Sequence, residues 1–208
     1  MDAASADRHD TWNLLSLGAL NAAHIVWWSG CWPAALLPGA IPLLFTADCC
    51  YLLADFSYLL LAPACVSPSV RPTLLLHHAI VVSCMPFAWG KPVLMAHLLR
   101  TWMVELHSFV HIAARKTQWP NLQALLARVN KPIFVGLRLI GFPLSWFAYA
   151  RDRAALSVAM RAAHAPGFVH VPLSIAHFAM YGLMLKWGHA LLFSRRNTSS
   201  GQGGSSQA

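Results

Sequence analysis

Charged side chains are scarce in this sequence, because Asp, Glu, Lys and Arg make up only 11% of its 208 residues. Soluble domains carry about 25% charged residues. Hydrophobic residues reach 57%, and the mean hydropathy is +0.51. These values exclude an ordinary soluble domain and indicate a chain whose solvent is largely the bilayer.

Paired cysteines and a cleavable signal are also missing. The chain has 5 cysteines, an odd number, and most lie within apolar runs, so we interpret them as packing residues and expect no disulfide framework. Residues 1–10 hold three Asp beside Arg8 and lack the basic region that precedes the apolar core of a signal peptide. We expect a polar N-terminal segment over 1–10, a transmembrane domain over 11–194 and a disordered Ser/Gly-rich tail over 195–208.

Apolar stretches separated by Pro, Gly or basic residues recur along the chain. A helix needs about 20 residues to cross a hydrocarbon core roughly 30 Å thick. Stretches of approximately this length cover Leu14–Trp32, Ile41–Ala62, Thr73–Trp89, Val93–Ala114, Pro132–Tyr149 and Phe168–Phe193. They predict an all-α fold, a polytopic bundle of about six transmembrane helices around a central polar cavity.

The segments between these stretches predict turns and an orientation. Gly90-Lys91-Pro92 predicts a tight turn between two antiparallel helices, since Pro92 lacks a backbone donor. Residues 120–130 are amphipathic and predict either a helix along the membrane interface or a plain connecting helix. With six spans, eight basic residues lie on the side of both termini and four on the other, which predicts cytosolic termini. The net charge of +8 is then mainly a topology signal, and no nucleic-acid partner is expected.

Ionisable residues occur within the apolar stretches. A full charge at the bilayer centre costs roughly 2.5–3.5 kcal/mol, so two Asp, two Arg and one Glu facing lipid would cost on the order of 10 kcal/mol. We therefore expect them to face inward, together with nearby His and Tyr. The set is Asp48, Tyr51, Asp55, His77, His78, Arg100, Glu105, His107, His111 and Arg138.

Helical geometry predicts how these side chains converge. Asp48 and Asp55 are seven residues apart and share a direction at about 100° per residue. By the same arithmetic Arg100, His107 and His111 share a stripe, while Glu105 points away from it. The adjacent His77 and His78 splay by about 100°, so one ring can face the cavity while the other meets a neighbouring helix. Four other histidines are expected to pack in or near helices against backbone carbonyls: His24, His170, His177 and His189.

The order of these features resembles the TLC-domain family (TRAM, Lag and CLN proteins). The matching stretches are TADCCYLLADFSYLLL, LLLHHAIVV, MVELHSFVHIAARK and KPIFVGLRLIGFP. The resemblance assigns the family's inward Asp to Asp55, its His pair to His77 and His78, its Glu to Glu105, its basic helix end to Arg115 and Lys116, and its later Arg to Arg138. It implies a helical bundle around a cavity, in the endoplasmic reticulum or another endomembrane, and a role in lipid metabolism or lipid homeostasis.

Our leading hypothesis from the sequence is a protein that binds or acylates a lipid within the membrane. The candidate catalytic residues are His77 and His78, of which one would be the base, with Asp55 and Glu105. The candidate cavity-lining residues are Asp48, Tyr51, Arg100, His107, His111 and Arg138. No resident cofactor is expected, and acyl-CoA would serve as a co-substrate. Ceramide synthesis is not favoured, because residues 79–105 lack the paired aspartates of the ceramide synthases.

Two other hypotheses start from different features. His107 and His111 have an HxxxH spacing that could share a metal, but two His on a helix face are more often packing groups, so no metal is expected. The Ser/Gly tail and the basic loops would suit a non-enzymatic escort, scaffold or translocation aid with membrane-protein partners. Membrane lipids are the partners that the leading hypothesis expects.

Overall fold

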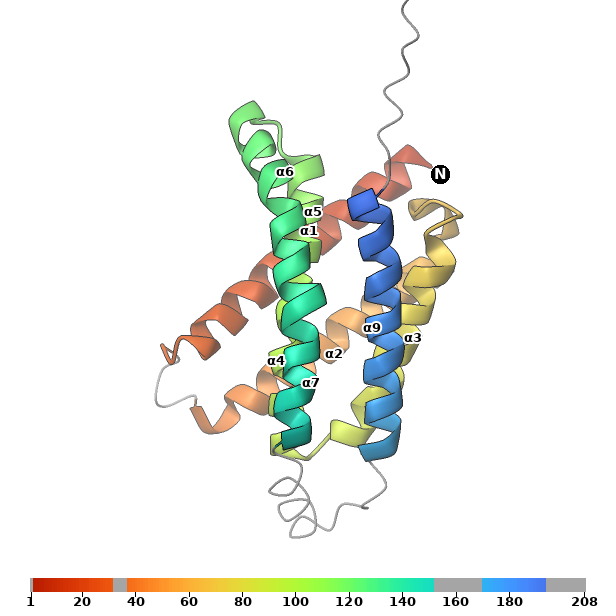
Figure 1. The fold of residues 1–208 in the computed structure, drawn as a ribbon. Helices are drawn as coiled ribbons and strands as arrows, with labels where there is room; N and C mark the ends of the chain where they lie inside the picture. Colours follow the sequence, from red (N-terminus) through yellow and green to blue (C-terminus); the bar gives the residue numbers. More distant parts are fainter. Residues whose placement is uncertain (1, 32–36, 152–169, 194–208) are drawn as a thin grey trace, which may run out of the picture.

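The computed structural model describes residues 2–31, 37–151 and 170–193, and these ranges contain helices and no β-strand. The tail at 195–208 and the outer ends of the first and sixth predicted stretches lie outside the described residues. In chain order (Figure 1) the elements are α1 (Ala3–Trp28), α2 (Leu37–Leu61), the short 3-10 helix η2 (Pro63–Cys65), α3 (Arg71–Ala88), α4 (Pro92–Thr101), the 3-10 turn η3 (Trp102–Val104), α5 (Glu105–Lys116), α6 (Pro120–Phe134), the π-helical segment η4 (Val135–Gly141), α7 (Phe142–Arg151) and α9 (His170–Phe193). The all-α prediction is confirmed.

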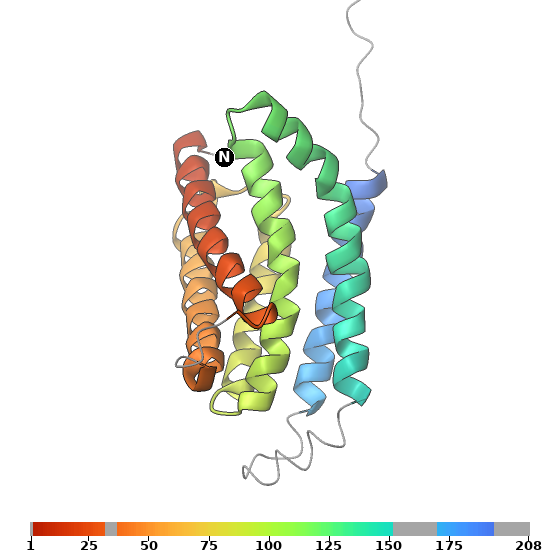
Figure 2. The same ribbon diagram turned by 90° about the vertical axis from the view of Figure 1, so that its left-hand side faces the viewer.

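Several elements join end to end into longer rods. The elements α4, η3 and α5 follow one another without a break, and so do α6, η4 and α7. Successive rods alternate in direction, so that the start of α1 and the end of α9 lie at the same end of the bundle (Figures 1 and 2). Each rod covers most of one apolar stretch identified in the sequence.

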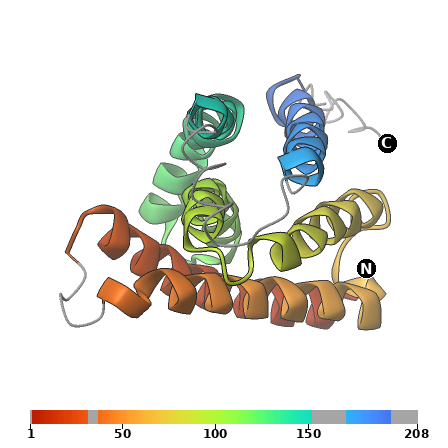
Figure 3. The same ribbon diagram turned by 90° about the horizontal axis from the view of Figure 1, so that it is seen from below.

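The rods form a layered bundle. Seen along its length (Figure 3), α2 lies along one side with α1 behind it, α7 and α9 lie on the opposite side, and α3 and α4 lie between them. Contacts agree with this view, since α1 packs on α2 and α5, α2 packs on α3 and α4, and α3 packs on α9. The middle layer therefore meets neighbours on both sides and positions the polar residues discussed below.

The turn between α3 and α4 is confirmed. Gly90 has a φ of +71°, a left-handed conformation that favours glycine, and Pro92 occupies the first turn of α4. The Lys91 amide donates to the carbonyl of Ala88 at 3.0 Å, which closes the turn. The two helices are thus held as an antiparallel hairpin.

The first helix begins within the segment expected to be polar at 1–10. The residues expected to form a polar segment over 1–10 belong to α1, which begins at Ala3. The side chain of Asp2 accepts hydrogen bonds from the amides of Ala4 and Ser5, at 3.2 and 3.1 Å, and caps the helix. Charged residues at this end therefore start the first helix.

The amphipathic segment at 120–130 forms most of α6, which runs on through Pro132 into η4 and α7. This is closer to the connecting helix than to a separate interfacial helix. Pro132 cannot donate a backbone hydrogen bond, and the π-helical segment directly after it changes the register of the rod.

The outer face of the bundle is strongly apolar. Leu144 and Phe147 of α7, and Val171, Ile175 and Phe178 of α9, are each more than half exposed. Soluble monomers rarely expose apolar side chains in such continuity. This face suits contact with hydrocarbon.

Two helices within the described ranges are long and apolar enough to cross a membrane, Gly39–Leu61 and Pro120–Arg151. Length and composition alone therefore give weak support for a membrane protein, and the six-span prediction is not confirmed. Other rods carry polar residues that lower their hydropathy. In α1, for example, Asn13, Asn21 and His24 are all buried against neighbouring helices.

A pair of glycines in α9 tests the packing of this bundle. A Cβ at Gly188 would lie 3.0 Å from Cε1 of Phe134, which is 2% exposed, whereas a Cβ at Gly182 meets nothing within 4 Å. We expect Gly188→Val to be about 1–3 kcal/mol more destabilising than Gly182→Val, because overpacking forces α9 away from α6. Thermal unfolding of both purified variants in detergent measures the difference. Equal stabilities would contradict the close approach of these helices.

Candidate functional site

A cavity of about 720 Å³ lies among α1, α2, α3, α5, η4 and α9. We call it the polar chamber, because side chains that can ionise or hydrogen bond contribute much of its wall. Those side chains are His9, Asp10, Asn13, Tyr51, Asp55, Ser67, His77, His78, Glu105, His107, Ser108, His111, Arg115, Arg138 and Trp187.

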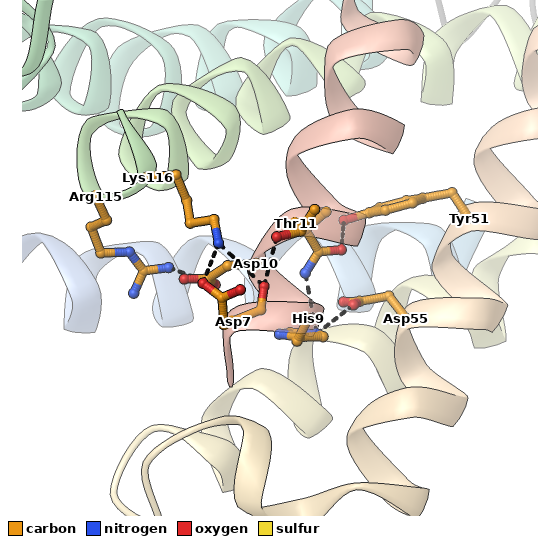
Figure 4. A network of polar contacts seen from close by, with 9 residues as sticks. Asp7, His9, Asp10, Thr11, Tyr51, Asp55, Arg115 and Lys116 are labelled. Atoms are coloured by element: carbon orange, nitrogen blue, oxygen red, sulfur yellow. Dashed lines mark hydrogen bonds and ion pairs between the residues drawn. The ribbon is translucent and has the colours of Figure 1, made fainter. Parts of the chain in front are cut away.

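Asp55 joins three helices at one side of the chamber. Its Oδ1 lies 2.7 Å from Nε2 of His9 on α1, and its Oδ2 lies 2.8 Å from Nε2 of His78 on α3 (Figure 4 shows the His9 contact). Asp55, His9 and His78 are all at most 4% exposed. One buried carboxylate therefore accepts from two imidazoles and ties α1 and α3 to α2.

The second nitrogen of His78 is also engaged. Its Nδ1 lies 2.9 Å from the carbonyl oxygen of Leu74, which can only accept a hydrogen bond. An ionised Asp55 can only accept as well, so both nitrogens of His78 carry protons when this carboxylate is ionised. His78 is then a cation paired with Asp55 and has no nitrogen left to act as a base.

Further contacts extend the group of Asp55, His9 and His78, which we call the Asp55 cluster, along α1 and α2. Asn13 Nδ2 lies 3.1 Å from His9 Nε2, and the hydroxyl of Tyr51 donates to Asn13 Oδ1 at 3.0 Å. These contacts hold Tyr51, at 8% exposure, against the wall of the chamber. The α1–α2 interface is thus polar along one stripe.

A second polar group surrounds Arg138, which sits in the π-helical segment and is 5% exposed. Its Nη2 donates to Ser108 Oγ at 2.6 Å and lies 3.8 Å from Glu105 Oε2, and its Nε donates to the Val104 carbonyl at 3.3 Å. The guanidinium also lies over the ring of Trp187 at 5.4 Å. Single-turn π segments inside α-helices often occur at functional sites.

His77 lies between the two groups. Its ring is T-shaped to that of His78, at 72°, and its Nε2 lies 3.9 Å from Glu105 Oε1. The splay predicted for the His pair is confirmed, since His78 meets Asp55 while His77 faces Glu105 and Trp187.

Some ring nitrogens in the chamber have no hydrogen-bond partner among the described residues. They are Nδ1 of His77 and both nitrogens of His107, and these two residues are 5% and 8% exposed. Burying such atoms without a partner costs about 1–3 kcal/mol each. The chamber therefore holds hydrogen-bonding capacity that the described protein leaves unused.

Most of the residues selected from the sequence meet at the chamber. Of the ten, eight line it: Tyr51, Asp55, His77, His78, Glu105, His107, His111 and Arg138. They come from four separate rods, so the polar residues converge as expected, but His111, which was predicted to face inward, is exposed even though it lines the chamber.

Arg100 was predicted to line the cavity, and this prediction is wrong, because Arg100 is exposed. The 3-10 turn of η3 lies between it and His107. A 3-10 helix advances about 120° per residue instead of about 100°, so three residues rotate the preceding helix by about 60° relative to an unbroken α-helix. The stripe drawn through Arg100, His107 and His111 therefore breaks at this turn.

Glu105 was predicted to point away from the histidine stripe, toward a different neighbour or the other side of its helix. It lines the chamber with His107 and reaches both His77 and Arg138. Its partners thus lie on α3 and in η4, which agrees with a direction toward different neighbours.

Asp48 is buried, as predicted, but it does not line the polar chamber. Its carboxylate lies 3.1 Å from Nε2 of His24 on α1. His24, for which a backbone partner was expected, therefore pairs with a carboxylate. Asp48 and Asp55 do share a direction, since both face α1, but the two His–Asp pairs sit at different heights along it.

Sequence reasoning missed His9, which lies in the polar segment expected over 1–10, and Asn13, which directly precedes the first apolar stretch at Leu14. A signal was present, since Ser5, His9, Asn13, Leu17 and Asn21 recur every four residues and mark one face of a helix. All five are buried.

A smaller cavity of about 100 Å³ adjoins the polar chamber. The two share Leu52, His77 and Glu105 in their walls. The smaller one, which we call the apolar pocket, lies among α3, α4, α7 and α9 and is lined mostly by apolar side chains, including Trp102, Phe142 and Trp146. A polar space and an apolar space therefore meet at His77.

The HxxxH pair does not gather further metal ligands in the part of the chain that is described. The rings of His107 and His111 stack at 6.0 Å, and no group of three or more His, Cys, Asp or Glu in these ranges is arranged to hold a metal ion. His111 instead lies 3.4 Å from Asn130 Nδ2.

Comparing two carboxylates tests how much the contacts of Asp55 with His9 and His78 stabilise the folded protein. Asp55→Ala leaves buried imidazoles without their counter-ion and should destabilise the protein by about 3–5 kcal/mol. Asp7→Ala removes a mostly exposed pair with Lys116 (Figure 4) and should cost less than about 1 kcal/mol. Thermal unfolding in detergent measures both, and a loss for Asp55→Ala no larger than for Asp7→Ala would contradict the cluster.

No family model matches the sequence, and neither a curated protein nor a solved structure matches the chain. The resemblance to the TLC-domain family stays a prediction.

Proposed function

We propose that this chain is a multi-pass endomembrane protein of the TLC-domain type that holds a lipid in its polar chamber and acts in lipid metabolism or membrane lipid homeostasis. The observation that carries the proposal is the chamber itself, a space of about 720 Å³ inside a bundle whose outer face is apolar. Its wall includes six buried ionisable residues: His9, Asp55, His77, His78, His107 and Arg138. That distribution is the reverse of the one in a soluble enzyme.

The dimensions of the rods support a bilayer location. The shortest rod, α3, has 18 residues, and the longest, Pro120–Arg151, has 32. At 1.5 Å per residue these span about 27 and 48 Å, against a hydrocarbon core of about 30 Å. The rod α1 is not one of the two most apolar helices, and it buries Asn13, Asn21 and His24 against neighbouring helices, where these side chains avoid lipid.

The grouping of the motif residues supports the family assignment. Asp55, the His pair, Glu105 and Arg138 were matched to the TLC pattern in separate stretches of the sequence. All of them line the polar chamber. A common site is what the resemblance requires of these residues.

Acyl transfer is the reaction that the side chains suit best. The oxygen or nitrogen of a lipid hydroxyl or amine would attack the carbonyl carbon of an acyl thioester, forming an ester or amide while the thiol leaves. His77 would take the proton from the attacking group and return it to the departing thiolate. It is better placed than His78, because its Nδ1 has no partner within the described residues whereas both nitrogens of His78 are engaged.

A non-enzymatic role is the second candidate. The observation that favours it is that each of the chamber's three carboxylates already has a basic partner. Asp55 pairs with His9 and His78, Glu105 with Arg138, and Asp10 with Arg115. Pairs of this kind can fix the helix register without taking part in any reaction. The protein would then act as an escort, a scaffold or a translocation aid.

Lipid analysis of cells with and without the protein tests the proposal. We expect the wild-type chain to change the lipid profile and His77→Ala, which removes the candidate base, to abolish the change at normal protein abundance. His78→Ala removes a buried partner of Asp55 and should instead lower protein abundance. His189→Ala, an exposed histidine on α9 outside the chamber, should behave as wild type.

Two results would count against an enzyme. A lipid change that persists in His77→Ala would favour the non-enzymatic role. An unchanged lipid profile with the wild-type chain would contradict a role in lipid metabolism altogether.

A further inference from the structure

We propose that the lipid held in the polar chamber has an uncharged head bearing hydroxyl or amide groups, bound between His77 and His107, with its hydrocarbon chain directed into the apolar pocket. This inference rests on the proposed function and narrows it to a class of ligand.

The first step is the unused hydrogen-bonding capacity. His107 lines the chamber and is 8% exposed, and neither of its ring nitrogens makes a hydrogen bond of good geometry among the described residues, although the side chain of Asn130 lies near enough to interact with it. His77 lines the same chamber and leaves its Nδ1 in the same condition. A ligand that reaches these atoms removes the cost of burying them unpaired.

The second step is the balance of charge around the chamber. Its ionised carboxylates each face a base, as Asp55 faces His9 and His78 while Glu105 faces Arg138 at 3.8 Å. At the end of the chamber nearest the start of α1, Asp10 pairs with Arg115 at 2.9 Å. A charged head would therefore enter a low-dielectric space without a free counter-ion, and such burial is costly.

The third step is the match between donors and acceptors. A neutral imidazole has one nitrogen that donates and one that accepts. Hydroxyl and amide groups also do both, whereas a carboxylate or phosphate mainly accepts and an ammonium only donates. The two nitrogens of His107 therefore suit an alcohol or amide head better than either charged class.

The fourth step is the position of the apolar pocket. Its wall shares Leu52, His77 and Glu105 with the wall of the polar chamber, so a head bound beside His77 leaves the start of its chain next to the pocket. The pocket volume of about 100 Å³ matches the first few methylenes of that chain. The rest of the apolar pocket is lined by residues that include Ile80, Val81, Trp102, Phe142 and Trp146. A single-chain amphiphile with its polar end at His77 would place its head in the polar chamber and its chain toward the apolar pocket.

Quenching of tryptophan fluorescence tests the ligand class on the purified full-length protein in detergent. The probes are three lipids with the same dibrominated 18-carbon chain, a monoacylglycerol, a fatty acid at alkaline pH and a primary amine. Bromine quenches nearby indoles, and Trp102 and Trp146 line the apolar pocket. We expect saturable quenching by the monoacylglycerol at a concentration at least tenfold lower than by either charged probe, and a smaller amplitude in Trp146→Phe.

Matched variants test the head-group contact. His107→Leu should weaken monoacylglycerol binding about tenfold, the effect of losing one or two hydrogen bonds. His107→Gln, which keeps a donor and an acceptor, should retain most of the affinity, and His189→Leu, outside both cavities, should bind as wild type. Elution as a monodisperse species on size-exclusion chromatography confirms that each variant is folded.

The outcomes separate this inference from the proposed function. Tighter binding of the fatty acid or the amine would overturn the uncharged head while leaving a lipid cavity in place. Wild-type affinity in a folded His107→Leu would also overturn it. Saturable quenching by none of the three probes would overturn both the inference and the lipid-holding function.

Discussion

A charged group inside an apolar helix bundle must meet a partner there, since an unpaired buried ion costs several kcal/mol. The contact of Asp55 with His9 and His78 meets this requirement with one carboxylate and two imidazoles, and it joins α1, α2 and α3. The Glu105–Arg138 contact does the same for α5 and the π segment. The register of the rods depends on these pairs, and the polar chamber is the space that they enclose.

Pairing of the charges also determines what remains available for function. His78 uses both of its nitrogens, whereas His77 and His107 keep nitrogens without partners among the described residues. Neutral imidazoles at the junction of a polar and an apolar space can bind an amphiphile or transfer a proton. The outer face, on which Phe147 and Ile175 are largely exposed, would suit contact with the lipids among which amphiphiles occur.

Regular helical geometry explains how far the sequence could predict this structure. The apolar stretches and the Gly90–Pro92 turn follow from composition and local rules, and the inward direction of Asp55 follows from the cost of burying charge in lipid. Arg100 was misplaced because the 3-10 turn at Trp102–Val104 has no clear signal in the sequence. The buried face of α1 that carries His9 had a local signal in its four-residue spacing, but the pairing of His9 with Asp55, 46 residues away, had none.

Lipid exposure of the outer face is the central claim, and it can be measured directly by spin-label accessibility. Labels placed at Leu144 and Ile175 of a cysteine-substituted chain in bilayers would be exposed to molecular oxygen, which concentrates in lipid, and to a water-soluble nickel complex. Both side chains are more than half exposed, on α7 and α9. We predict strong relaxation by oxygen and little by nickel at both positions. Stronger relaxation by nickel would show that these residues face water and would contradict a polar chamber held within a membrane.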